Sequence, residues 1–192
     1  QKGWIALDAL YGHELTALCR PEELIELTYC ARDFARKYDL TIDTAMITDV
    51  PGYTWGIVPV LAHSGVRYFG AGPNRGHRIG FTLSEWGDKP SYWVSPSGQE
   101  RVLFWVAGNG YSLWHGALMR DGSRLLGELQ RLEEREYPYD ITYVRYSIGG
   151  DNGPPDDGLC DFVRDWNAKY AYPKLIISTQ REMFEAFEAR YG

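Results

Sequence analysis

At 192 residues the chain is long enough for one sizeable domain and short for two. Hydrophobic residues make up 44% of it and charged residues 24%, as in ordinary globular proteins. The net charge of −6 argues against nucleic acid or an anionic membrane as a partner, and no apolar run approaches membrane-spanning length.

Strand-like and helix-like patterns alternate along the chain, which predicts βαβ units and a mainly parallel sheet in one domain spanning 1–192. Strands are expected at 4–11, 41–49, 66–72, 139–149 and 174–178, with a hairpin over 91–110. Helices are expected at 21–38, 55–65, 121–136 and 156–170, followed by a last helix that a capping box of Thr179 and Glu182 begins.

Three aspartates stand in or just after predicted strands: Asp8, Asp49 and Asp151. Parallel strands bring their C-terminal ends to one edge, so carboxylates far apart in sequence can converge there. Two of them could serve as the nucleophile and the acid/base of a glycosidase, and three could hold a divalent cation. The plainer alternative is that each caps the loop or helix that follows.

Other chemistry has weaker support. The four histidines lack zinc-site spacing, although His13 and His115 could line a cleft, and no GxSxG or GxGxxG motif occurs. The three cysteines show no disulfide or zinc spacing, so we expect reduced, buried thiols and a cytoplasmic protein. Seven Trp and fourteen Tyr fit either an aromatic core or sugar recognition, because such rings stack on pyranose faces.

The segment "TDVPGYTWGIVPVLAHSGVRYFGAGPN" resembles the nucleophile region of glycoside hydrolase family 38, the retaining α-mannosidases. The later "YSIGGDNGPPDDGLCDFVRDWN" looks like that family's Gly-rich segment, with Asp151 at its aspartate. The resemblance implies the seven-stranded β/α barrel of the glycoside hydrolase and deacetylase type. It makes Asp49 the nucleophile and a ligand of a divalent metal, zinc in this reading. Asp8, from the group of strand-end aspartates, is expected as a second ligand.

The same resemblance suggests which residues would contact a carbohydrate substrate: Tyr53, Trp55, Asn74, Trp114, His115 and Asp151. Two departures matter: the chain contains no His-x-Asp pair, and Ser147 stands where some members carry a histidine. We therefore expect an incomplete barrel whose opening strand lies upstream of Gln1. Its open sheet edges would either drive self-association or be covered by loops.

Three functions remain open. The first is a retaining glycoside hydrolase, α-mannosidase-like, with this chain as the later part of its catalytic domain. The second is a metal-dependent carbohydrate deacetylase, which the histidine spacing disfavours. The third is a non-catalytic sugar-binding or structural remnant of the barrel, which the missing His-x-Asp pair favours.

Overall fold

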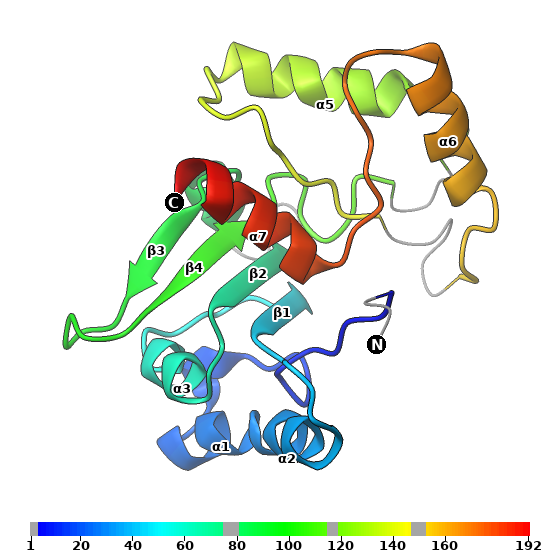
Figure 1. The fold of residues 1–192 in the computed structure, drawn as a ribbon. Coiled ribbons are helices and arrows are strands. Elements are labelled where there is room, and N and C mark those ends of the chain that lie inside the picture. The colour runs from blue at the N-terminus through cyan, green and yellow to red at the C-terminus, as the bar shows by residue number, and fades with distance from the viewer. Residues whose placement is uncertain (1–3, 75–80, 115–118, 147–152) are drawn as a thin grey trace. The chain divides into compact units, whose positions relative to one another are not determined.

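The computed structural model describes residues 4–74, 81–114, 119–146 and 153–192 (Figure 1). The chain divides into two compact units. The first comprises 1–111 and 179–192, and the second comprises 112–178. The expectation of one catalytic domain over 1–192 stays a prediction.

A four-stranded sheet in the order β1-β2-β4-β3 forms the centre of the first unit. Strands β1, β2 and β4 are parallel, and β3 runs antiparallel to β4, as the hairpin signal predicted. The described part of the chain is therefore a mixed α/β fold with an open sheet, and the seven-stranded barrel stays a prediction. The strands span Thr44–Asp49 (β1), Tyr68–Pro73 (β2), Ser91–Val94 (β3) and Arg101–Val106 (β4).

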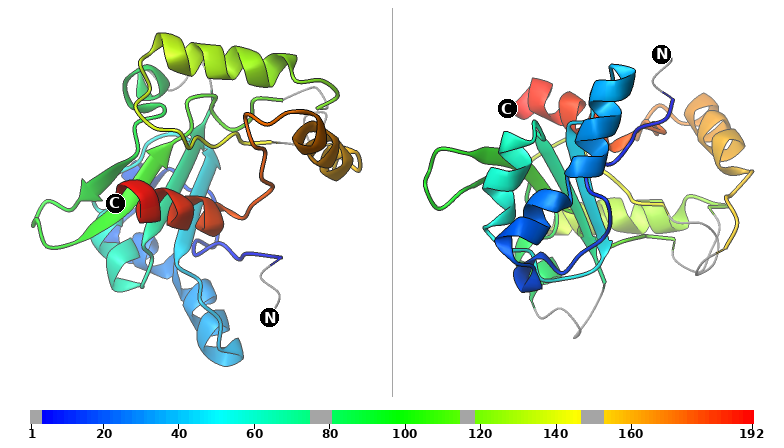
Figure 2. Two further views of the ribbon diagram at one scale, coloured as in Figure 1. Left: turned by 45° about the horizontal axis from the view of Figure 1, so that its top comes forward. Right: turned by 90° about the horizontal axis from the view of Figure 1, so that it is seen from below.

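Helices cover both faces of this sheet (Figures 1 and 2). On one face Ile47, Phe69 and Val102 form a core with residues of α1 and α3. On the other face Tyr68 stacks on Phe184 of α7 with ring centroids 5.2 Å apart. The helices of this unit are η1 (Thr16–Leu18), α1 (Pro21–Glu26), α2 (Tyr29–Tyr38), α3 (Ile57–His63), α4 (Thr82–Trp86) and α7 (Gln180–Tyr191).

The helix predicted over 21–38 is broken into α1 and α2. At the break the Leu27 carbonyl accepts a 2.8 Å hydrogen bond from the Tyr11 amide. The buried Thr28 hydroxyl donates to the Ile25 carbonyl at 3.0 Å and lies 2.9 Å from the Ser64 hydroxyl. These contacts occupy groups that a continuous helix would pair internally. Beyond the break α2 has no buried residue, and Figure 2 shows it standing away from the sheet.

The strand predicted over 4–11 is wrong for the residues described there, 4–11, which carry no strand. Trp4 and Ile5 are exposed, and only Ala9 and Leu10 of the segment are buried. A backbone hydrogen bond runs from the Ala9 amide of this segment to the Thr44 carbonyl of β1 at 3.0 Å. The apolar run therefore passes the edge of the sheet without pairing as a strand.

The second unit contains the predicted helices as α5 (Ser123–Glu134) and α6 (Leu159–Lys169). The strands predicted over 139–149 and 174–178 are wrong within the described part, where both segments are irregular. At Leu175 the reason is local, because the Asn167 side chain bonds both its amide (2.9 Å) and its carbonyl (2.7 Å). Those are the groups that a neighbouring strand would have used.

Two further expectations concern the cysteines and membrane-spanning helices. The cysteines are free, as expected, but Cys30 and Cys160 are exposed rather than buried. Within the described ranges, no helix has the length and apolarity needed to cross a membrane.

Candidate active site

Asp49 is the last residue of β1, and its side chain is held by the neighbouring strand end. Asn74, which directly follows β2, donates a 2.7 Å hydrogen bond from Nδ2 to Oδ1 of Asp49. Asp49 also has a backbone φ of 67°, in the left-handed region that few non-glycine residues adopt. Such conformations persist where surrounding structure holds them, and they cluster at functional sites.

Hydrogen bonds with Thr16 hold the loop between β1 and α3. The buried Thr16 hydroxyl donates to the Gly52 carbonyl at 3.1 Å and accepts from the Thr54 amide at 3.0 Å. The Ala17 amide adds a 2.8 Å hydrogen bond to the same Gly52 carbonyl. Gly52 itself has φ 84°, which explains why the turn after Pro51 needs a glycine. The loop following Asp49 is therefore held by three hydrogen bonds.

His13 and Asp8 lie on the segment that passes the outer side of β1. The Thr48 amide donates to Nδ1 of His13 at 2.8 Å, which brings the imidazole to the residue before Asp49. The exposed Asp8 accepts from the Leu10 amide at 2.8 Å, as a turn-capping carboxylate does. The sequence offered His13 as a cleft residue, and its contact with the end of β1 adds it to the candidate site.

The two aromatics after Asp49 have different surroundings. Tyr53 is half-buried and makes edge contacts with Phe69 (6.1 Å) and Phe104 (6.2 Å) beside the core. Trp55 is exposed, and its indole Nε1 donates to the Val94 carbonyl of β3 at 3.0 Å. Trp55 thus presents an exposed ring held in place by a hydrogen bond, whereas the ring of Tyr53 packs inward. Their roles as sugar contacts stay predictions.

Sequence reasoning missed Asp88, which lies beside Val106 at the C-terminal end of β4. Its amide donates to the Val106 carbonyl at 2.9 Å, and its carboxylate accepts from the Gly108 amide at 2.9 Å. A Cβ at Gly108 would collide with that carboxylate. Asp88 is buried and has φ 57°. The Gly-Asp-Lys-Pro run was the available signal, since such residues mark turns with unusual backbone angles.

In the second unit, the part that resembles the late Gly-rich segment is only partly described. Asp151 and His115 lie outside the described residues, as does Ser147. Trp114 is buried and lies 5.6 Å from the ring of Tyr146. The role of Trp114 as a sugar contact stays a prediction.

A hydrogen bond between Tyr146 and Asp156 joins two described parts of this segment. The Tyr146 hydroxyl donates to the Asp156 carboxylate and accepts from the Met119 amide at 2.9 Å. Arg120 Nη1 lies 3.1 Å from the same carboxylate, whose side chain is 1% exposed. The hydrogen bond from Tyr146 is the main reason that the pKa of Asp156 is lowered, and it outweighs burial.

A metal centre is not assembled by the described residues. No group of three or more His, Cys, Asp and Glu side chains close enough to hold a cation occurs in the described ranges. Asp49 and Asp8 each contact a nitrogen donor of the protein, Asn74 and the Leu10 amide respectively. These residues do not by themselves fit a zinc site.

Comparisons with known proteins give one informative result. No family model and no curated protein matches the chain. Among solved structures, an alpha-mannosidase from Enterococcus faecalis V583 superposes with a TM-score of 0.65 over 97% of this chain, at 14% sequence identity. The chain covers 20% of that protein's length. The fold of this chain is therefore similar to that of part of an alpha-mannosidase.

Proposed function

We propose that this chain is part of the catalytic domain of a retaining glycoside hydrolase, α-mannosidase-like and related to family 38, with Asp49 as the nucleophile. The observation that carries the proposal is the setting of Asp49. It ends a parallel strand, has a left-handed backbone, and its carboxylate is oriented by Asn74 from the next strand end. The similarity of the fold to part of an alpha-mannosidase supports a carbohydrate as substrate.

The hydrogen bond from Asn74 suits a nucleophilic carboxylate. An amide donor at 2.7 Å fixes the direction in which the carboxylate oxygens point. In a retaining reaction a carboxylate oxygen bonds to the anomeric carbon while the glycosidic C–O bond breaks, and an acid gives the leaving oxygen a proton. Water then hydrolyses the glycosyl-enzyme, which restores the carboxylate.

The hydrogen bonds that hold the loop after Asp49 would also favour this reaction. Displacing a reacting group by about 1 Å can cost on the order of a hundredfold in rate. Thr16 holds Gly52 and Thr54 of the loop that follows Asp49 in the sequence, and Asn74 holds the carboxylate itself. Binding of a divalent metal such as zinc by Asp49 and Asp8 stays a prediction.

The proposal is tested with a fluorinated mannoside that accumulates the glycosyl-enzyme, followed by peptide mass spectrometry. We expect the label on Asp49, and we expect Asp49→Asn to lower hydrolysis of 4-nitrophenyl α-D-mannopyranoside by at least about a thousandfold. Both measurements use this chain and a version extended upstream. If Asp49→Ala is rescued by azide with formation of a glycosyl azide, the covalent role is supported independently.

Asp39→Asn provides the matched control. Asp39 is also exposed and also left-handed, with φ 51°, but it ends α2 rather than a strand. Activity should survive this change. Labelling of another carboxylate, or full activity of Asp49→Asn, would overturn the assignment of the nucleophile.

The non-catalytic alternative keeps one specific observation in its favour, the lack of a metal-binding cluster in the described ranges. It predicts sugar binding that survives Asp49→Asn, with no turnover by the wild-type chain or by the extended version. The deacetylase alternative would require release of acetate from an acetylated sugar.

A further inference from the structure

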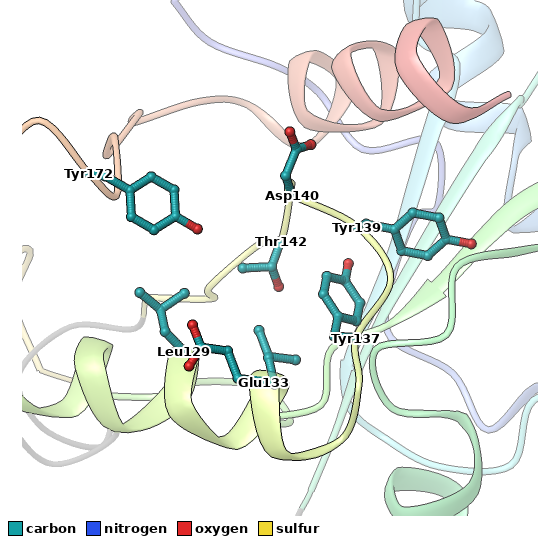
Figure 3. A pocket seen from close by; sticks show the side chains of 8 residues that line it. Leu129, Glu133, Tyr137, Tyr139, Asp140, Thr142 and Tyr172 are labelled. Atoms are coloured by element: carbon teal, nitrogen blue, oxygen red, sulfur yellow. The ribbon is translucent and has the colours of Figure 1, made fainter.

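The second unit contains a hollow between the end of α5 and the segments that follow it (Figure 3). Leu129 and Leu132 of α5 form its apolar floor, and Tyr137 stands beside them. The hollow has a volume of about 80 Å³, which is room for a few groups the size of a water molecule, so a larger ligand would enter it only in part. The described residues that line it all belong to the second unit.

The wall around Tyr137 is held by backbone and side-chain hydrogen bonds. The Tyr137 amide donates to the Leu132 carbonyl at 3.0 Å, and its hydroxyl donates to the Ile141 carbonyl at 2.8 Å. Its ring also meets Tyr139 edge-on at 5.4 Å. The turn after α5 and the segment leading to Thr142 are therefore fixed relative to one another, so the hollow is built into the unit.

Three polar side chains face this hollow from different segments: Glu133, Thr142 and Tyr172. Figure 3 shows the Tyr172 hydroxyl pointing toward the space between Thr142 and Glu133. None of the three side chains has an intramolecular hydrogen bond or ion pair among the described residues. One carboxylate acceptor and two hydroxyls, each both donor and acceptor, are thus available to a ligand.

The chemistry of the lining selects among ligands. Among the described lining residues none is basic, and the Glu133 carboxylate faces the hollow, which disfavours an anion. A cation held by aromatic rings would need ring faces, whereas Tyr172 turns its hydroxyl end inward. Asp140, whose carboxylate points away from the hollow in Figure 3, does not add a second facing charge. Mixed donors and acceptors above an apolar floor match a neutral polyol.

We propose that this hollow is a binding subsite for a single neutral pyranose unit, held by Glu133, Thr142 and Tyr172 over Leu129 and Leu132. The subsite goes beyond the proposed hydrolysis and shares no residue with the Asp49 site. Sugar hydroxyls would accept from Thr142 and Tyr172 and donate to Glu133, and the apolar face of the ring would lie on the leucines.

The test is ligand-observed NMR with methyl α-D-mannopyranoside and the whole chain. We expect saturable, weak binding, and we expect Thr142→Val, Tyr172→Phe and Glu133→Gln each to weaken it by roughly fivefold. These changes remove polar atoms and keep the shape of the side chain, so folding should be retained. Circular dichroism and thermal melting check that each variant is folded.

Two control variants match the exposure of the substituted groups. Tyr11→Phe alters a tyrosine of the first unit that is 79% exposed, against 73% for Tyr172. Glu134→Gln alters the glutamate next to Glu133 on α5, which does not line the hollow. Both should bind the sugar as the wild type does.

Failure of this inference can be told apart from failure of the proposed hydrolysis. Asp49→Asn should retain the subsite binding, because that residue belongs to the other unit. The subsite is overturned if methyl α-D-mannopyranoside shows no saturable binding even at concentrations well above the millimolar range. It is also overturned if the three subsite variants bind the sugar as tightly as the wild type does. Both outcomes hold whatever the hydrolysis assays show. Preferential binding of tetramethylammonium would overturn it in favour of a cation site.

Discussion

The hydroxyl of Thr16 bonds to two residues that lie far away in the sequence, Gly52 after 36 residues and Thr54 after 38. Thr16 is also buried. Removing one partner of a buried hydrogen bond costs more than the bond contributes, because the remaining group is left without water or partner. Thr16 therefore contributes to the stability of the first unit as well as to the order of the loop behind Asp49.

We expect Thr16→Val to lower the free energy of unfolding by about 2 kcal/mol, since the Thr54 amide loses its acceptor and valine keeps the volume. Urea unfolding followed by fluorescence measures the change. Thr16→Ser keeps the hydroxyl and should cost less than half as much. Equal stability of Thr16→Val and the wild type would show that the hydroxyl contributes nothing.

At the scale of residues, sequence reasoning found part of the candidate site. The resemblance named Asp49 and Asn74, and the structure places them in direct contact. Thr16 and Asp88 could not be found in this way, because their partners are backbone groups far away in the sequence. No local pattern of residue types records such a contact.

At the scale of elements, helix periodicity predicted better than strand patterns did. The expected helices at 55–65, 121–136 and 156–170 are present as α3, α5 and α6, since spacing and end signals belong to the helix itself. Strands depend on a neighbour that the sequence does not name. The apolar runs at 4–11 and 174–178 therefore stay irregular where no ladder partner is present within the described residues.

Helix α7 is attached to the sheet through Glu188. Its carboxylate accepts from the hydroxyls of Tyr68 (2.7 Å) and Tyr92 (2.9 Å) and pairs with Arg67 at 2.6 Å. Burial raises the pKa of Glu188, but the tyrosine hydrogen bonds and the charges of Arg67 and Arg101 together lower it below 4.5. Burial and the bond to Glu188 also raise the pKa of Tyr68.

We expect Glu188→Gln to lower the free energy of unfolding at pH 7 by about 1–2 kcal/mol. Because the pKa of Glu188 is lower in the folded state, its stabilisation is complete above pH 4.5 and is lost as the pH falls through the folded value. The difference between variant and wild type should therefore shrink below that pH. Urea titrations from pH 3 to pH 7 (roughly the span of carboxylate titration) measure it.

Glu14→Gln is the control for Glu188, since Glu14 is exposed and lies in a loop. It should leave both the stability and its pH dependence unchanged. A difference for Glu188→Gln that persists undiminished at acid pH would contradict the ionic part of the account.

At the scale of the whole molecule, the open edge of β1 bears on whether copies of the chain associate. The Thr44 carbonyl of this strand accepts from the Ala9 amide, and the Thr48 amide donates to His13. Residues 9 and 13 thus cover part of the edge, in line with the expectation that loops would cover open edges. The other edge strand, β3, is short, and Pro90 and Pro96 flank it, which discourages pairing with another chain.

We expect His13→Ala to increase self-association, because it uncovers the Thr48 amide at the edge of β1. Sedimentation velocity over a range of concentrations should give a larger weight-average coefficient for this variant than for the wild type. His63→Ala, which alters an exposed histidine on α3, should behave as the wild type. Association that is the same in all three proteins would place the contact elsewhere.

Helix α2 leaves the sheet without burying any of its side chains. Its free energy of opening therefore comes from its own ten residues, through local contacts such as the Arg36–Asp33 ion pair and the Phe34–Tyr38 ring contact. Isolated helices of this length are marginal in water. Within one unit, then, we expect the amides of α2 to exchange with solvent through local unfolding of that helix, well before the amides of the central strands do.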